Sequence, residues 1–191
     1  MSHHPTSTLP TCKKDLLAAI EAGALFSYGY FWGHRKSKDG SITKSCLSQW
    51  WEAAFEVEGR RFATAEHYMM FRKAELFGDH EMAAKVLEAP TPRDAKSLGR
   101  KVRGFNEAQW LAHREEIVFT ANLAKFTQNP ALRSFLHRTA PDILVEASPM
   151  DAIWGIGASA EDPRAAEPGE WPGLNLLGFA LVKVREQLGA V

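Results

Sequence analysis

The chain has 191 residues, 45% of them apolar, which is enough for one domain with a substantial buried core. Its 23 basic residues are balanced by 23 acidic ones, so it has no positive field that would coat nucleic acid generically. Two cysteines, Cys12 and Cys46, are too few for a disulfide framework, and no apolar run approaches the ~20 residues of a membrane span. We therefore expect a soluble, cytoplasmic protein.

The predicted elements, in chain order, are typical of a mostly helical α+β fold with a small sheet or hairpin. A polar tail containing His3-His4, interpreted as solvated, leads into a short amphipathic helix at 13–22. Residues 51–63 alternate around Glu58-Gly59, which predicts a hairpin. Further helices are predicted at 64–77, 81–88, 92–98, 106–126, 130–138 and 175–188, with a buried strand at 143–146. We place the tail and first helix at 1–25, a single catalytic domain at 26–188, and a flexible surface loop at 158–172.

Two ionisable residues lie on the apolar face of the helix predicted after Thr64. On a helical wheel, Glu66 and Lys73 share a stripe with Met70. They are about 10.5 Å apart along the axis at about 1.5 Å per residue, too far for an i,i+4 ion pair. One interpretation pairs each with a distant charge, or lets Lys73 reach solvent. The other places the stripe beside a cleft, where partial burial favours the neutral forms that an acid/base carboxyl and an amine nucleophile require.

The strand at 143–146 is followed by a loop with a carboxylate, an indole and two glycines. Asp151 could accept ribose hydroxyls, Trp154 could stack on a base, and the amides of Gly155 and Gly157 could approach phosphate. Alternatively, Asp151 caps a turn and Trp154 fills the core. The residues alone leave both interpretations open.

Five further residues are weaker candidates for substrate binding. Ser48 and Trp50 belong to a polar and indole cluster before the hairpin, where core packing is the usual explanation. Arg100 follows a helix end and could meet either a phosphate or solvent. Trp110 lies on the apolar face of the 106–126 helix, and Asn175 stands in the position of an N-cap.

Two common classes of catalytic site have no support in the sequence. No His or Cys pair has metal-ligand spacing, and there is no Gly-x-Ser-x-Gly elbow. We therefore expect neither a metal, another cofactor, nor a serine hydrolase of that kind. Lys125 is interpreted as the cation that closes the 106–126 helix.

Several short motifs, weak one by one, form a specific combination through their order and spacing. They are Phe31-Trp32, 47–50 (LSQW), 64–70 (TAEHYMM), Lys73-Ala74, 98–100 (LGR), 124–126 (AKF), 145–151 (VEASPMD), 154–157 (WGIG) and 173–178 (GLNLLG). This combination resembles the NADAR (YbiA-like) family over residues 26–188. Some members have Asn where this chain has Gln49, and others resemble this chain.

The resemblance implies an α+β domain that hydrolyses N-glycosidic bonds to phosphorylated ribose. Family substrates include aminouracil ribotides of the riboflavin pathway and ADP-ribose on guanine, and the latter activity implies an ADP-ribosyltransferase toxin as a partner. By similarity, Glu66 and Asp151 are the acidic active-site residues and Lys73 attacks the anomeric carbon to form a Schiff base. Trp110 and Trp154 would line the pocket.

The chemistry of N-riboside cleavage fits these assignments. The transition state has oxocarbenium character, so a nearby carboxylate stabilises it and an acid assists departure of the base. We expect Glu66 to transfer the proton and Asp151 to anchor ribose hydroxyls. Two alternatives remain: a module that binds ADP-ribose or a related nucleotide without cleaving it, and a scaffold in which these residues serve packing alone.

Overall fold

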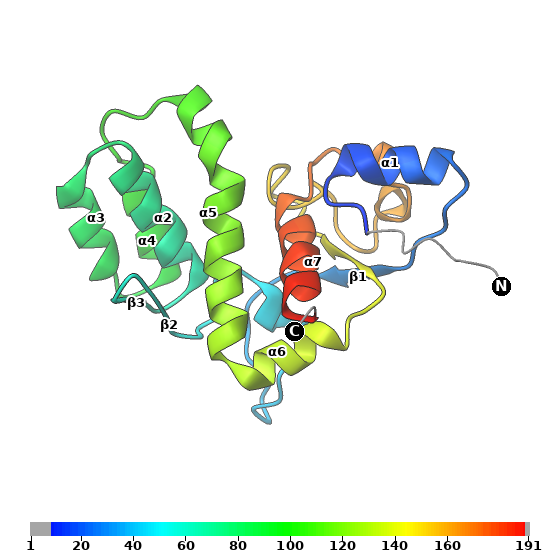
Figure 1. Cartoon of the computed structure of the whole chain (residues 1–191), viewed down its shortest axis with the longest axis horizontal. Helices are drawn as coiled ribbons and strands as arrows, with labels where there is room; N and C mark the ends of the chain where they lie inside the picture. The colour runs from blue at the N-terminus through cyan, green and yellow to red at the C-terminus, as the bar shows by residue number, and fades with distance from the viewer. Residues whose placement is uncertain (1–8, 190–191) are drawn as a thin grey trace. The chain divides into compact units, whose positions relative to one another are not determined.

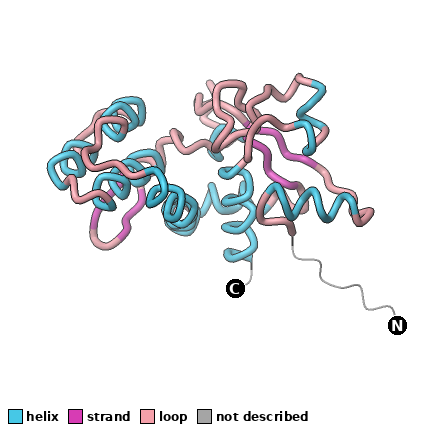
Figure 2. Tube along the Cα trace, turned by 90° about the horizontal axis from the view of Figure 1, so that it is seen from above, coloured by secondary structure: helices cyan, strands magenta, loops and turns pink. Residues whose placement is uncertain are grey.

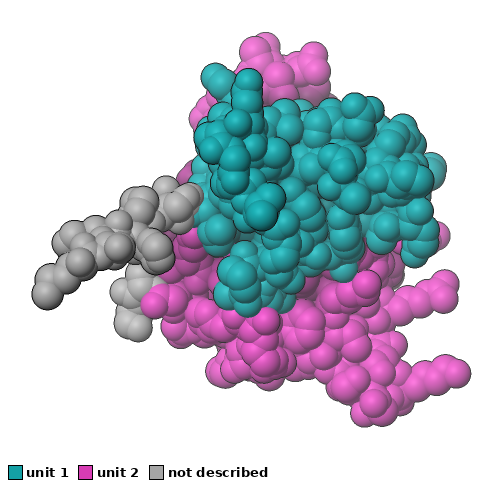
Figure 3. Space-filling model, turned by 90° about the vertical axis from the view of Figure 1, so that its right-hand side faces the viewer, with its two compact units in different colours: residues 1–30, 139–183 teal, residues 31–138, 184–191 magenta. Residues whose placement is uncertain are grey.

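The computed structural model describes residues 9–189, so the predicted solvation of His3-His4 lies outside the described residues. Contacts divide the chain into two compact units, which Figure 3 colours separately. Unit 1 comprises residues 1–30 and 139–183, and unit 2 comprises residues 31–138 and 184–191. The predicted single domain at 26–188 includes parts of both units, because the chain leaves unit 1 after residue 30 and returns to it at residue 139. Each unit is described by itself.

Unit 1 is built around a small sheet. It contains helix α1 (Lys13–Glu21), strands β1 (Tyr28–Phe31) and β4 (Ile143–Glu146), and the start of helix α7 (Leu176–Gly189). The last residue of β1, Phe31, already belongs to unit 2. Strand β1 pairs with β4, and Figure 2 shows the two strands side by side. Apolar side chains from every part of the unit form its core: Leu16, Ile143, Val145, Ala147, Ile156, Ala158, Ala165, Trp171 and Phe179.

The segment 158–172, expected as a surface loop, also contributes to this core. It contains two 3-10 helices, η2 (Pro163–Ala166) and η3 (Pro168–Glu170). Trp171 is 3% exposed, and its indole N–H donates to the carbonyl oxygen of Ala165 at 2.9 Å. The buried indole anchors the segment to the core. The sequence did not indicate this, because the Pro, Glu and Ala residues of the segment follow no helical or strand periodicity.

Unit 2 is mostly helical. After the 3-10 helix η1 (Lys44–Leu47), the chain forms a hairpin of β2 (Phe55–Val57) and β3 (Arg60–Phe62). The helices that follow are α2 (Ala65–Leu76), α3 (His80–Leu87), α4 (Pro92–Gly99), α5 (Glu107–Gln128) and α6 (Pro130–His137). Helix α2 packs against α3, α4 and α5, as Figure 1 shows for the green part of the chain. None of the helices described in either unit is long and apolar enough to cross a membrane.

The helices of unit 2 begin where their capping residues predict. Thr64, Asp79, Thr91 and Asn106 each accept a hydrogen bond from the backbone N–H three residues later. Such caps satisfy one of the four amides that have no partner inside the first turn. The hairpin turn is as predicted, because Glu58 and Gly59 both adopt positive φ between antiparallel β2 and β3. The mostly helical α+β class is thus confirmed.

Aromatic side chains join the hairpin to α2. The Phe62 ring lies 5.0 Å from that of Tyr68 and 5.3 Å from that of Phe71, centroid to centroid. Phe55 completes the cluster, and all four side chains are buried. Edge-on and tilted packing of this kind adds to the stabilisation from apolar burial, so the hairpin and the first two turns of α2 form one packed body.

Candidate functional site

The predicted site residues are divided between the two units. Unit 2 carries Ser48, Trp50, Glu66, Lys73, Arg100 and Trp110. Unit 1 carries Asp151, Trp154, Gly155, Gly157 and Asn175. The two groups of residues are therefore described one after the other.

Glu66 stands in the first turn of α2 and is almost completely buried, with 2% of its surface exposed. Its backbone N–H donates to the carbonyl oxygen of Gln49 at 3.0 Å, which ties the start of the helix to the 46–49 segment. The predicted apolar stripe understates the burial of α2, because the helix is buried on all sides from Ala65 to Phe71. Packing against three other helices and the hairpin explains this difference. Glu66 is thus a carboxyl inside the protein, where solvation is poor.

Lys73 lies two turns further along α2 in a half-buried, aromatic environment. Its Nζ donates to the carbonyl oxygen of Gly99 at 2.9 Å, and lies 4.6 Å from the ring centroid of Phe105 and 5.7 Å from that of Trp110. Burial lowers the pKa of Lys73 below its ordinary value, and the positive charge of Arg100 lowers it further. A larger share of neutral amine is available than for a solvated lysine, which is what a nucleophile requires.

Gly99 allows this arrangement because it has no side chain. A Cβ at this position would overlap the Met70 Sδ and lie 2.8 Å from Met70 Cγ, so only glycine lets α4 approach α2 this closely. Arg100, the C-cap of α4, is exposed, and its guanidinium makes no hydrogen bond or ion pair with another residue of 9–189. Helix α4 ends at Gly99, whose φ is not positive, so glycine is required here for close packing and not for a left-handed backbone.

Ser48 and Gln49 are buried, at 8% and 6% exposure, and their hydrogen bonds hold backbone and neighbouring side chains. The Ser48 hydroxyl oxygen accepts from the Trp50 N–H at 3.1 Å, so it stabilises a turn. The Gln49 Oε1 accepts from Asn122 Nδ2 at 2.9 Å. These bonds give Ser48 and Gln49 a supporting role for the segment that meets Glu66.

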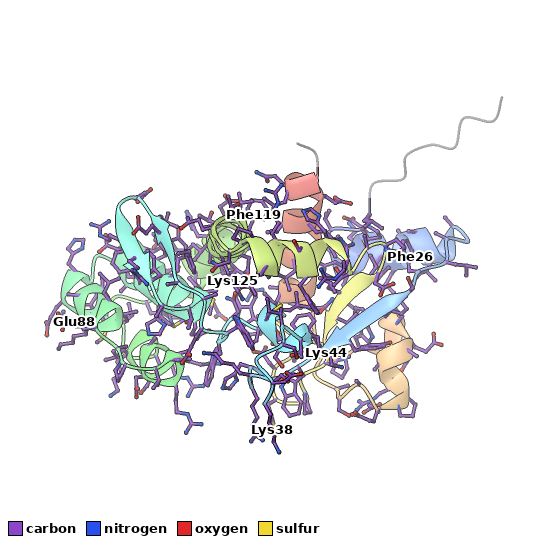
Figure 4. The ribbon with its side chains drawn as sticks, turned by 90° about the horizontal axis from the view of Figure 1, so that it is seen from below. Phe26, Lys38, Lys44, Glu88, Phe119 and Lys125 are labelled. Carbon is purple, nitrogen blue, oxygen red and sulfur yellow. The ribbon has the colours of Figure 1, made fainter. Side chains whose placement is uncertain are left out.

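Sequence reasoning missed the two residues of α5 that hold this segment. Asn122 and Lys125 are both fully buried. Lys125 lies in the last turn of α5, as predicted, and Figure 4 labels it. Its Nζ also donates to the carbonyl oxygens of Cys46 at 2.7 Å and Ser48 at 2.9 Å, which the sequence did not predict. The signal was present, because Lys125 follows the buried Ile117 and Ala121 at helical spacing. Burial lowers the pKa of Lys125 to about 7, but its enclosed amine is out of reach of a sugar.

Trp50 is half-buried and lines a cavity of about 830 Å³ within unit 2. Its ring contacts that of His34 at 5.2 Å between centroids, and Lys96 Nζ lies 5.8 Å from its ring centroid. The cavity is otherwise lined by residues 34–36, 52 and 91–94. Neither Glu66 nor Lys73 is among the residues that line this cavity.

In unit 1, Asp151 forms a tight turn after β4. Its Oδ1 accepts from the N–H groups of Ile153 at 2.9 Å and Trp154 at 2.8 Å. This is the turn-capping role that the sequence offered as the alternative to ribose binding. Oδ2 has no hydrogen-bond donor among residues 9–189, and the side chain is only partly buried, so a ligand hydroxyl could still reach it. Trp154 is also only partly buried.

The two glycines of this loop serve its close packing. A Cβ on Gly155 would lie 2.7 Å from the carbonyl oxygen of Glu146, and Gly157 has φ +71°. The N–H of Gly157 donates to the Asp151 carbonyl oxygen at 3.0 Å, so this amide is not free to approach a phosphate. The predicted anion-binding role of Gly157 is therefore not supported by the geometry.

Asn175 is fully buried and joins α7 to β4. Its Nδ2 donates to the Leu144 carbonyl oxygen, and its Oδ1 accepts from the Glu146 N–H, both at 2.9 Å. It adopts φ +55°, which asparagine tolerates better than most residues. The N-cap interpretation was wrong about its side chain, which bonds the strand. With both polar groups in use, Asn175 supports the loop.

Among the described residues, no three His, Cys, Asp or Glu side chains are gathered so that they could hold a metal ion. The groups available for chemistry are thus the carboxyl of Glu66 and the amine of Lys73 in unit 2, with Asp151 in unit 1.

Comparisons with known proteins identify the family to which the chain belongs. The sequence profile of the NADAR domain matches residues 30–189. The chain is 42% identical over 165 residues to N-glycosidase R617 of Acanthamoeba polyphaga mimivirus, an alignment that covers 84% of this chain and 95% of that protein. It is 33% identical to N-glycosidase YbiA of Escherichia coli over 70% of this chain and 74% of that protein. The NMR structure of E. coli YbiA matches with a TM-score of 0.67 at 27% identity, and covers 87% of this chain and 88% of that one.

Proposed function

Because the chain belongs to the NADAR domain family, we propose that it is an N-glycosidase that hydrolyses the bond between a base and a phosphorylated ribose. The general activity follows from the relatives, since mimivirus R617 and E. coli YbiA are both N-glycosidases. The alignment with R617 covers 95% of that protein. The phosphorylated ribose comes from the resemblance to the family, and the residue roles are argued from the contacts of each side chain.

The observation that carries the mechanism is the environment of Lys73. Its Nζ is held by the Gly99 carbonyl oxygen beside two aromatic rings, and its pKa is lowered by burial and by Arg100. The neutral amine attacks C1 of the ribose while the bond from C1 to the base nitrogen breaks. The amine then loses a proton, and the ring oxygen leaves C1 as a hydroxyl, which gives a protonated imine.

Water completes the reaction. It adds to C1 of the imine, the Lys73 amine departs, and the free sugar is released, so one water is consumed for each base set free. Glu66, buried on the same helix, donates the proton that the departing base nitrogen needs and regains it from the attacking water. Its place on the same helix as Lys73 supports this assignment.

Asp151 and Arg100 are assigned to binding. The Asp151 Oδ2, which the turn leaves unused, is suited to accept from ribose hydroxyls. The exposed Arg100 guanidinium follows α4 and is suited to a phosphate, for which arginine offers paired donors. Trp110 and Trp154 supply half-buried indoles on which a base or sugar can pack.

The test is to trap the imine with two substrates, ADP-ribosylated guanosine and the aminouracil ribotide. Each is incubated with the protein, with and without borohydride, and both the free base and the protein mass are measured. We expect base release from at least one substrate and, with borohydride, a sugar-sized addition on the peptide containing Lys73. Base release with no adduct on Lys73 would exclude the covalent route, and binding without base release from either substrate would identify a binding module.

A further inference from the structure

The side chain of Lys125 is a buried cation held by backbone carbonyls. It is fully buried, and its Nζ bonds the carbonyl oxygens of Cys46 and Ser48 at 2.7 and 2.9 Å. Two carbonyls two residues apart therefore converge on one ammonium. The Ser48 carbonyl oxygen also accepts from the Trp51 N–H at 3.2 Å, so the Lys125 amine and the backbone of the turn share this acceptor.

Within residues 9–189, an aromatic ring and a thiol face the Lys125 amine. The Phe126 ring centroid lies 5.1 Å from Nζ, and the neighbouring Cys46 thiol has a pKa raised by burial to about 11, so it is neutral at physiological pH. Arg138 is the other charge near Cys46, and it is also positive. Burying a cation without a counter-charge is costly, and an apolar residue of similar size would fill the same volume at less cost. The bonds that the ammonium makes therefore need an explanation beyond packing.

The residue next to these carbonyls touches the catalytic helix. The Gln49 carbonyl oxygen accepts from the Glu66 N–H at 3.0 Å, and this amide belongs to the first turn of α2, where helix amides lack partners within the helix. The side chain of Gln49 is held in turn by Asn122, one helical turn before Lys125 on α5. Two residues of α5, one helical turn apart, thus hold the segment that bonds the start of α2.

We propose that Lys125 is a positioning residue for the N-glycosidase reaction: by holding the 46–48 turn it fixes Gln49, and through Gln49 it sets the place of Glu66. The inference rests on the proposed role of Glu66 as proton donor. Proton transfer depends strongly on the distance between donor and acceptor, so a small displacement of the first turn of α2 slows turnover without abolishing substrate binding.

The first test needs no substrate. Amide hydrogen exchange is measured in the wild type and in Lys125→Met, which keeps the volume and removes the ammonium. We expect the Glu66 amide to exchange at least about 10-fold faster in the variant, while the Ala83 amide, bonded to Asp79 in α3, keeps its rate. Unchanged exchange at Glu66 in a folded variant would overturn the proposal, whether or not the protein proves to be an N-glycosidase.

The second test uses whichever of the two substrates the wild type turns over. For Lys125→Met we expect kcat to fall by about 10- to 100-fold with KM within about twofold of the wild-type value. Gln128→Ala is the matched control, because Gln128 also lies on α5 and makes two hydrogen bonds to backbone atoms, in its case those of Glu56. It should leave kcat unchanged. An equal fall of kcat in both variants would assign Lys125 a purely structural role.

Two further variants address folding and the path of the effect. Should Lys125→Met fail to fold, Lys125→Gln retains N–H donors for the turn, and we expect the same two effects at smaller size. Asn122→Leu removes the hydrogen bond from Asn122 to the Gln49 side chain. In the double variant with Lys125→Met, the fold-decrease of kcat should be smaller than the product of the two single fold-decreases. Multiplicative effects would mean that the two residues act independently and would contradict the path through Gln49.

Discussion

Lys73 Nζ donates to the carbonyl oxygen of Gly99 at 2.9 Å, and this bond joins the amine of α2 to the last residue of α4. The carbonyl is available at this place because Gly99 brings α4 against Met70 of α2. An amine held by one acceptor keeps a defined position, and the Phe105 and Trp110 rings lie beside it. Helix packing thereby positions the amine and lowers its pKa.

Replacing Lys73 with methionine should stop the reaction while the fold is preserved. We expect kcat to fall by at least about 10²-fold, because the carbon–nitrogen bond to C1 can no longer form. The measurement is steady-state release of free base. Lys101→Met removes an exposed lysine and should keep the wild-type rate.

The lowered pKa of Lys73 predicts how the rate depends on pH. The rate should rise as the amine loses its proton and should level off below the ordinary lysine pKa of about 10.5. Arg100→Gln removes a positive charge, so the pKa of Lys73 should rise and the rising limb of the profile should move to higher pH. Arg100→Lys keeps the charge and should leave the limb in place. Coincident profiles of Arg100→Gln and the wild type would mean that the charge of Arg100 does not act on Lys73.

The buried Lys125 predicts a rise of stability with pH. Its pKa is about 7 in the folded protein and about 10.5 in the unfolded chain, so between these values the unfolded chain binds the extra proton. The free energy of unfolding contributed by this group should therefore increase from about pH 7 to about pH 10.5 and be constant below this range. Urea unfolding at a series of pH values tests this. The difference in unfolding free energy between the wild type and Lys125→Met should grow over that range, in favour of the wild type.

Gly99→Ala should destabilise the protein and disturb the amine together. The new methyl group would overlap Met70, so α4 must move away from α2, at a cost of about 1–3 kcal/mol. Denaturant unfolding measures this loss, and the carbonyl that holds Lys73 should be displaced with the helix. Adding Met70→Ala makes room for the methyl group. If the double variant is no more stable than the sum of the single effects predicts, overlap with Met70 is not the cause.

Asn175→Ala tests whether Asn175 supports the loop or binds substrate. The change removes two buried hydrogen bonds and leaves backbone groups of Leu144 and Glu146 without partners, so we expect a loss of about 2–4 kcal/mol. KM, measured at a temperature where the variant is folded, should stay near the wild-type value. A large rise of KM with unchanged stability would restore the substrate-binding role.

The sequence by itself determined the local structure. Thr64 and Asn106 cap helices through bonds that span three residues, and Glu58-Gly59 forms its turn through backbone angles of those two residues, so neighbouring side chains carry the necessary information. Helical periodicity likewise placed Glu66 and Lys73 on a buried face. What these residues touch was not visible in this way.

Only the tertiary structure decided the partners of the buried polar groups. Lys125 looked like the cation that ends its helix, yet it bonds carbonyls 77 and 79 residues earlier in the chain. Asn175 stood in an N-cap position, yet its side chain bonds a strand about 30 residues away. The physical reason is that burial obliges a polar group to find a hydrogen-bond partner, while the identity of that partner depends on which distant segment packs against it. For Lys73, the sequence therefore determined the helix face on which the amine lies. The approach of α4 determined which carbonyl holds this amine.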